Sequence, residues 1–408
     1  MNITHSKRLL IVSAALIGSV ITLGESVSGQ APQQLAKLES VRPQAHEGFG
    51  VSVALRGDLV VIGAPGGDGL SAGSVELFDA SAPGQPVFLA ALGGPLSAQH
   101  RSLGAQVALS RRLAVVSAPF GATGDPEAGA VLIYDIRDPA HPLELARIPS
   151  PEDTFLFGEL LDLDGDRLLI SSSFSLDAPQ GPWLYSLRDP SAPVLLSELH
   201  LDGSVDHEGQ LRSVLLRGDL AIVGAPFDSQ VTPLAGAAYV FDISDPEQPQ
   251  QLAQVQAPVP ELQGFFGSAV ASNGRFVAIA ATGDSELGKD AGAVYIYDLA
   301  APAGAAPLTK ILARNGQPGE RFGQPLTWAG DTLLVSRYFS GSGSVDLFDM
   351  SQPAAPRQLA RFSARDSSPR DRFGVALAVH ADKLLVGAHH DSDKLSRAGS
   401  ASLFNWSR

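Results

Sequence analysis

The residues best suited to chemistry stand close together near the C-terminus. His389, His390 and Asp391 are consecutive, and Asp393 follows two positions later. Imidazole and carboxylate groups together could hold a transition-metal ion. Their spacing matches no known metal motif and the surrounding segment is polar, so a solvated loop is the better interpretation. We therefore keep the first three as candidate ligand-binding residues and predict no metal.

A second candidate is the segment 336–343, in which Arg337 precedes Tyr338 and Phe339. An arginine beside two exposed aromatic side chains suits a contact surface, because tyrosine and arginine are enriched in binding hot spots. A buried role for Tyr338 or Phe339 is an equally open alternative. The sequence holds no nucleophile elbow, no His-Glu-x-x-His and no phosphate loop. Any catalytic site must therefore be assembled from distant segments.

The elements that could assemble such a site repeat along the chain. A glycine, usually after phenylalanine, recurs at Gly50, Gly104, Gly158, Gly267, Gly323 and Gly374, and Leu211 takes its place in the fourth unit. The spacing of about 54 residues predicts seven units, which start near residues 48, 102, 156, 209, 265, 321 and 372. A repeat of this length is typical of propellers and solenoids.

Each unit contains four strand-like runs. In the first unit they cover 51–55, 59–62, 74–78 and 87–92. Short runs rich in β-branched and aromatic residues, bounded by Gly, Pro and Asp, favour strands over helices. Tight Gly-Asp turns join the first two runs, and this turn chemistry explains Arg56-Gly57-Asp58 better than an integrin-recognition role.

We predict an all-β fold, a seven-bladed β-propeller of four-stranded antiparallel blades. One blade cannot bury both faces, but seven can pack side by side in a ring. A linear solenoid or two sandwiches is the alternative. The last unit stops after its third strand, and 34–39 resembles the missing fourth strand. We therefore expect 34–39 to close the last blade within a single domain, 30–408.

Residues 1–29 are predicted to be a signal peptide. Lys7 and Arg8 precede an apolar stretch, 9–23, that is short for a membrane span. An uncleaved anchor is the alternative. After cleavage we expect no membrane span and a secreted, periplasmic or cell-surface location. The chain has no cysteine and a net charge of −14, so we expect neither disulfides nor a nucleic-acid partner.

The pattern Phe-Gly-x-Ser-Val-Ala-Leu, Gly-Asp, Val-Val-x-Gly-Ala-Pro and Ala-Gly-x-Val-x-x-Phe-Asp resembles the FG-GAP repeat of integrin α-subunit propellers, in its bacterial secreted form. The resemblance covers 48–406 and is weaker in the third and sixth units. Loops of the form Asp-Pro-x-x-Pro are similar to those of LVIVD repeats. The resemblance implies an exported propeller with adhesion, envelope or matrix roles.

One departure from that family concerns calcium. Calcium-binding FG-GAP repeats carry a long Asp-rich loop between the first two strands, and here this link is a tight turn in all seven units. The closest segment contains Asp162, Asp164 and Asp166, but the first two belong to a strand. A tight turn cannot supply the six or more oxygens that calcium needs. We predict no repeat calcium sites and no other cofactor.

In a propeller, the loops between the second and third strands lie on the same face as the connections between blades, and ligands usually bind there. We call it the loop face. It is expected to carry His46, Glu47, Asp68, His100, Arg101, Asp125, His207, Asp228, Asp284, Arg321, Tyr338, Phe339, Arg372, His389 and Asp391. Our ligand-binding candidates are His46, His100, Arg101, Asp228, Arg337, Tyr338, Phe339, Arg372, His389, His390 and Asp391.

We therefore expect a monomeric, non-catalytic binding propeller for an extracellular or periplasmic protein or glycan. The alternative is a carbohydrate-active enzyme, a polysaccharide lyase or glycosidase, that uses the central funnel. It would require an axial cluster of His, Arg, Tyr or paired carboxylates. A lectin would instead show aromatic shelves repeated in the loops, and the sequence shows no such repetition.

Overall fold

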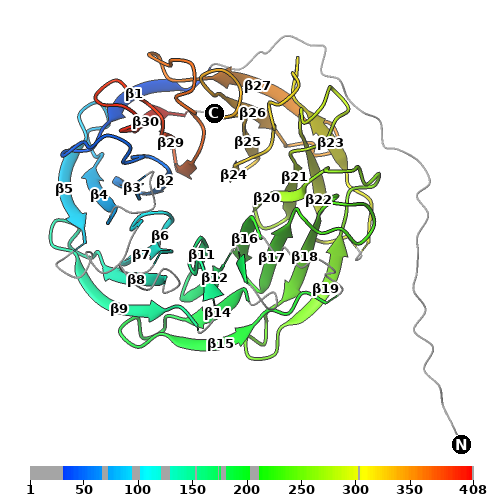
Figure 1. Ribbon diagram of the computed structural model, residues 1–408, viewed down its shortest axis with the longest axis horizontal. Helices are drawn as coiled ribbons and strands as arrows, with labels where there is room; N and C mark the ends of the chain where they lie inside the picture. The colour runs from blue at the N-terminus through cyan, green and yellow to red at the C-terminus, as the bar shows by residue number, and fades with distance from the viewer. Residues whose placement is uncertain are drawn as a thin grey trace, which may run out of the picture.

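The structure is a computed structural model. It describes residues 31–66, 72–93, 102–120, 129–151, 154–172, 174–175, 181–202, 211–301 and 304–406. This part of the chain contains strands and no helix. The strands form seven four-stranded antiparallel sheets that stand in a ring (Figure 1). The predicted seven-bladed β-propeller is confirmed.

Each blade begins at the central axis. The inner strands are β2 (Ser52–Arg56), β6 (Val107–Leu109), β11 (Leu160–Asp164), β16 (Ser213–Arg217), β20 (Phe266–Ser272), β24 (Leu326–Ala329) and β28 (Leu377–His380). The second strands are β3 (Leu59–Ala64), β7 (Leu113–Ala118), β12 (Arg167–Ser171), β17 (Leu220–Ala225), β21 (Phe276–Ala281), β25 (Thr332–Ser336) and β29 (Lys383–Ala388).

The other two strands of each blade lie toward the rim. The third strands are β4 (Ser74–Asp79), β8 (Ala130–Asp135), β14 (Trp183–Ser186), β18 (Ala237–Asp242), β22 (Ala293–Asp298), β26 (Val345–Asp349) and β30 (Ser400–Asn405). The outer strands are β5 (Val87–Leu92), β9 (Leu143–Pro149), β15 (Val194–Glu198), β19 (Gln250–Val255), β23 (Thr309–Leu312), β27 (Arg357–Phe362) and β1 (Gln33–Leu38). A short ribbon, β10 (Thr154–Phe155) with β13 (Phe174–Ser175), accompanies the third blade.

The N-terminal strand completes the last blade. β1 pairs antiparallel with β30, with Gln33 opposite Asn405 and Leu38 opposite Ala401. β1 therefore supplies the outer strand of the sheet that β28 to β30 begin (Figure 1). The predicted closure is confirmed. Because β1 pairs with β30, the outward edge of this third strand has hydrogen-bonding partners and is not left open.

The hydrophobic core lies between blades. Seven buried clusters each combine residues of two neighbouring blades, so that every blade is covered on both faces. The aromatic residue near the end of each third strand belongs to these clusters and is at most 8% exposed: Phe78, Tyr134, Tyr185, Phe241, Tyr297, Phe348 and Phe404. Their recurrence along the sequence therefore reflects packing between blades.

The repeated glycines are required where blades meet. Gly104 has φ +93°, a region that side chains rarely adopt, and the Ser52 hydroxyl donates to its carbonyl oxygen across the blade boundary at 2.7 Å. A Cβ added at Gly63 would lie 2.1 Å from the same oxygen. Neighbouring blades can therefore approach this closely only if both positions lack a side chain.

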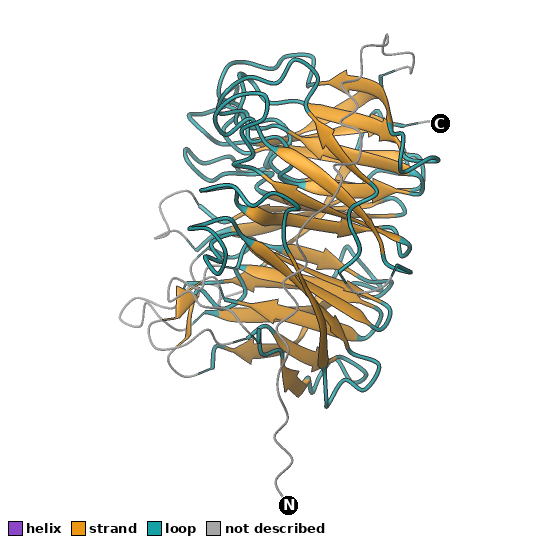
Figure 2. Cartoon of the chain, turned by 90° about the vertical axis from the view of Figure 1, so that its right-hand side faces the viewer, coloured by secondary structure: helices purple, strands orange, loops and turns teal. Residues whose placement is uncertain are grey.

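The disc has two different faces. Seen from the side, longer loops gather at one face and shorter turns at the other (Figure 2). By the antiparallel order of the strands, the loop face carries the connections between second and third strands and the connections between blades. The opposite face carries the tight first-to-second turns. Within the described ranges, no helix has the length and apolar character that crossing a membrane requires.

Candidate functional site

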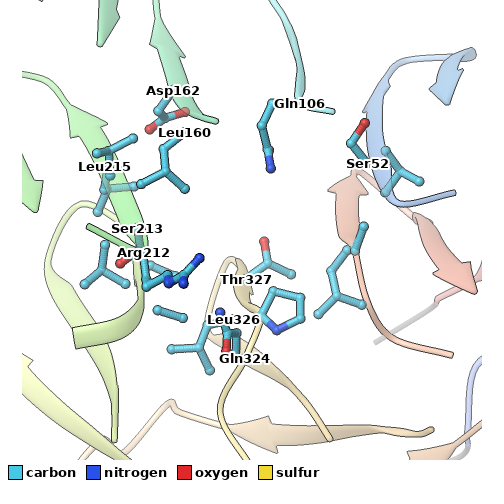
Figure 3. A pocket seen from close by; sticks show the side chains of 18 of the residues that line it. Ser52, Gln106, Leu160, Asp162, Arg212, Ser213, Leu215, Gln324, Leu326 and Thr327 are labelled. Atoms are coloured by element: carbon cyan, nitrogen blue, oxygen red, sulfur yellow. The ribbon is translucent and has the colours of Figure 1, made fainter. Parts of the chain in front are cut away.

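A cavity of about 590 Å³ lies on the propeller axis and is lined by inner-strand residues of all seven blades (Figure 3). Many of its lining residues are aliphatic, because each inner strand packs side chains between neighbouring blades, but polar groups make up more of the surface that the cavity exposes. Neutral polar groups interrupt this wall, among them Gln106, Gln324 and Thr327. A volume of this size is in the range of small-ligand sites, about 300–1,000 Å³.

Asp162 is a carboxylate in this wall. Its Oδ2 accepts from the backbone N–H of Leu216 in the next blade at 2.7 Å, and its Oδ1 accepts from Leu163 at 2.9 Å. Burial nevertheless raises the pKa of Asp162 to about 6. The carboxylate therefore ties the third blade to the fourth, and both of its oxygens already accept backbone hydrogen bonds.

Three guanidinium groups and two aromatic rings gather where the channel opens on the loop face. We call this group the mouth cluster, and its members are Arg212, Arg321, Tyr338, Phe339 and Arg372. The two rings lie against each other with centroids 4.2 Å apart. The guanidinium carbons of Arg321 and Arg372 lie 5.2 and 5.3 Å from the Phe339 centroid, within cation–π range.

Arg212 and Tyr338 connect the mouth cluster to the cavity, because both line it. The Arg212 side chain extends toward the middle of the channel (Figure 3). Its guanidinium also lies 5.5 Å from the Phe227 centroid and 3.5 Å from a Glu159 oxygen. Burial raises the pKa of Tyr338 and outweighs the three guanidiniums of the cluster, which act to lower it.

Two arginines of the mouth cluster occupy a strained backbone position. Arg321 and Arg372 directly precede the phenylalanine of the repeat, with φ +51° and +60°. The first blade has Gly48 there, with φ +69°, and a Cβ on Gly48 would meet nothing within 4 Å. The repeat therefore demands a left-handed residue at this position and leaves space for its side chain. Glycine would satisfy the backbone at less cost than arginine.

Comparison with known proteins agrees with this architecture. The family model described as FG-GAP repeat matches residues 33–78 and 356–404, which lie in the first, sixth and seventh blades. These two segments therefore carry FG-GAP repeats. Among solved structures, the computationally designed Ika8 protein is similar at 14% sequence identity with a TM-score of 0.53, over 91% of this chain and 99% of that one. That likeness shows the fold alone. A search of curated proteins finds no match.

The propeller fold places two candidate aspartates at equivalent points of two blades. Asp228 is 3% exposed, and its carboxylate accepts from the Tyr239 hydroxyl at 2.5 Å. Asp391 holds the equivalent position in the seventh blade and accepts from the Ser400 hydroxyl at 2.6 Å. Both also accept backbone N–H bonds within their own loops. These carboxylates fold the second-to-third-strand loops back onto the blade.

Arg337 lies inside the sixth blade and is 2% exposed. Its guanidinium forms ion pairs with Asp346 and with Glu320, the latter at 2.9 Å. Asp346 also accepts from Arg361 at 2.8 Å. From the sequence, Arg337 is expected beside exposed aromatics. It instead occupies the position of the alanine of the Gly-Ala-Pro motif, where a long side chain turns into the blade.

The histidines lie near the mouth cluster as neutral groups. Burial lowers the pKa of His389 to about 3 and that of His390 to about 4, and the nearby Arg372 acts in the same direction on both. The Nδ1 of His389 is buried without a hydrogen-bond partner in the described part of the protein. His46 is exposed, with φ +62°. Across the described ranges, no three His, Asp or Glu side chains form a group that could hold a metal ion.

The structure thus brings Tyr338, Phe339 and Arg372 together, with the two histidines beside them. His100 and Arg101 lie outside the described residues. Arg212 was not among the residues predicted from the sequence, although the repeat places Leu211 at the glycine position and Arg212 directly after it. That position lies where each inner strand enters the channel, so the alignment of the repeats could have indicated Arg212.

Proposed function

We propose that this protein is an exported, non-catalytic binding propeller that holds an extracellular or periplasmic protein or glycan at the mouth of its channel. Propellers with FG-GAP repeats commonly act as protein-binding scaffolds, which supports a binding role. The basic and apolar N-terminal segment supports export.

The observation that carries the proposal is the mouth cluster. Phe339 is 37% exposed, and two guanidinium groups lie within cation–π range of its ring at the entrance of the axial cavity. Aromatic and arginine side chains held by a rigid scaffold are the residue types that contribute most to binding energy. The opposite face carries the tight first-to-second-strand turns and the third-to-fourth-strand loops, and the channel mouth with its arginines and aromatic rings lies on the loop face.

A carbohydrate-active enzyme is the competing function, and two features of the channel favour binding over catalysis. A glycosidase uses a pair of carboxyl groups, whereas Asp162 accepts backbone hydrogen bonds with both oxygens. A lyase that used Tyr338 as its base would need a lowered pKa, and burial raises the pKa of Tyr338.

The test combines binding with product analysis. The mature chain is screened against immobilised glycans and extracellular proteins, and soluble products are followed by mass spectrometry. We expect saturable binding without product. The double variant Arg321→Gly/Arg372→Gly should weaken binding about 10-fold or more.

Arg275→Ala is the matched control. This arginine makes the same kind of contact, 4.8 Å from the Phe276 centroid, but lies in a first-to-second-strand turn on the opposite face. It should leave binding within about 2-fold of the unaltered chain. Product formation, or an equal loss in both variants, would contradict the proposal.

A further inference from the structure

The mouth cluster places positive charge in an otherwise acidic protein. The chain has a net charge of −14, and two lysines near the loop face are neutralised by nearby carboxylates. Lys310 pairs with Asp284 at 2.6 Å, and Lys37 pairs with Asp391 at 2.7 Å. Within the described ranges, Arg321 and Arg372 pair with no carboxylate and contact the ring of Phe339 instead.

This arrangement leaves the N–H donors of both guanidinium groups free to bind a ligand. A ring face attracts a cation without using its N–H donors in ion pairs. A guanidinium whose donors remain available binds a carboxylate in a bidentate manner, which a lysine cannot do. Together these features point to an anionic group as the ligand.

Below the guanidiniums the cavity offers neutral hydrogen-bonding groups. The side chains of Gln106 and Gln324 extend into the channel from the second and sixth blades (Figure 3). Neither side-chain amide has a hydrogen-bond partner within the described ranges. An amide can donate and accept at once, so it suits hydroxyl groups. A ligand that pairs with the guanidinium groups at the mouth and with the amides in the cavity carries hydroxyls next to an anionic group.

The shape of the site separates a saccharide from a folded protein. A cavity of about 590 Å³ encloses a small ligand or the end of a narrow chain, whereas a stable protein interface covers about 800 Å² of each partner. We propose that the mouth binds a carboxylate-bearing saccharide, a uronate residue or the end of a uronate chain. Arg321 and Arg372 hold its carboxylate, and Gln106 and Gln324 bond its hydroxyls. This inference rests on the proposed binding function and specifies its ligand.

The test is calorimetric titration of the mature chain with trigalacturonate, compared with its methyl ester. The ester has nearly the same shape but no charge. We expect the acid to bind about 10-fold or more tightly than the ester, and rising salt from about 50 mM to about 500 mM to weaken it. Arg321→Gly/Arg372→Gly should abolish the preference for the acid, because the left-handed backbone is kept while both charges are lost.

Gln324→Ala should weaken acid and ester alike, and Arg275→Ala should change neither. Circular dichroism and thermal melts verify that each variant is folded. Equal binding of acid and ester, or no binding of the acid, overturns the saccharide inference. An acidic peptide that binds in its place, and loses affinity in the double variant, also overturns it but leaves the proposed binding function intact. Binding that is unaffected by the double variant overturns both.

Discussion

Asp162 shows how a single residue can be chemically unusual for structural reasons. It lies in the channel wall, yet its two oxygens accept backbone N–H groups of the third and fourth blades. Burial raises the pKa of this carboxyl to about 6, above the value of about 3.9 for an unfolded chain. A raised pKa in a channel is often taken as a sign of catalysis. Here it accompanies a contact between blades.

This carboxyl should make stability depend on pH. Between about pH 4 and pH 6 the folded state binds more protons at Asp162 than the unfolded state, so its contribution to the free energy of unfolding falls as pH rises. In Asp162→Asn that fall is absent. The stability of the variant relative to the unaltered chain should therefore improve by about 2 kcal/mol from pH 4 to pH 7, measured by urea unfolding at both values.

Asp189 is a control in which the pKa of the carboxyl is shifted in the opposite direction. It is an exposed turn residue, and hydrogen bonds from Ser191 lower the pKa of its carboxyl. Its stabilising effect is therefore lost as pH falls below about 4, so Asp189→Asn should not improve in relative stability as pH rises. If Asp162→Asn behaves like Asp189→Asn, Asp162 has no raised pKa.

At the scale of the elements, the strand β1 is joined to the last blade by charge as well as by its ladder. The Lys37 ammonium lies 2.8, 2.7 and 2.6 Å from the carboxylates of Asp366, Asp391 and Asp393. Burial acts to lower the pKa of Lys37, but the hydrogen bonds to these carboxylates outweigh it and raise the pKa. One cation thus compensates three acids where the two ends of the chain meet.

Lys37→Met should therefore destabilise the protein strongly. The substitution keeps the length of the side chain but leaves Asp391, which is 6% exposed, without its cation. Breaking a buried pair in this way costs about 3–5 kcal/mol, measured as the loss of unfolding free energy in guanidinium chloride.

Lys394→Met is the control, because Lys394 is exposed and its contact with Glu39 is long, 3.4 Å. It should cost less than about 1 kcal/mol. If both variants lose the same amount, the charges around Lys37 do not hold the strand.

At the scale of the whole molecule, stability depends on a closed ring. Each blade is covered by two neighbours, and the seventh blade is complete only when β1 pairs with β30. Without β1, the third strand β30 would present an unpaired edge, and such edges pair with other chains.

A chain that starts at Ser40 should consequently melt at a lower temperature and form dimers or aggregates, as observed by light scattering after gel filtration. A chain that starts at Pro32 keeps β1 and should melt at the same temperature as the full chain and stay monomeric. A monomeric, equally stable chain from Ser40 would show that ring closure contributes little.

The sequence by itself determined the architecture. The glycines from Gly50 to Gly374 recur at a spacing of about 54 residues, with Leu211 in the fourth unit, because a Cβ at these glycines would lie too close to the neighbouring blade. The likeness of 34–39 to the fourth strands predicted closure, because a missing strand and a spare one must pair. Each blade repeats the same short pattern of glycines and strands, and a pattern that recurs along the chain can be recognised in the sequence.

Only the tertiary structure decided which polar residues meet. Arg212, Arg321 and Arg372 come from three different blades and converge because the ring brings equivalent positions to one axis. Residues that lie two positions apart have different environments: Arg337 is buried in ion pairs, while Phe339 is exposed. The direction of a side chain at a loop depends on the backbone conformation and on which opposite charges lie within reach. Those are set by contacts between segments that are distant in the sequence.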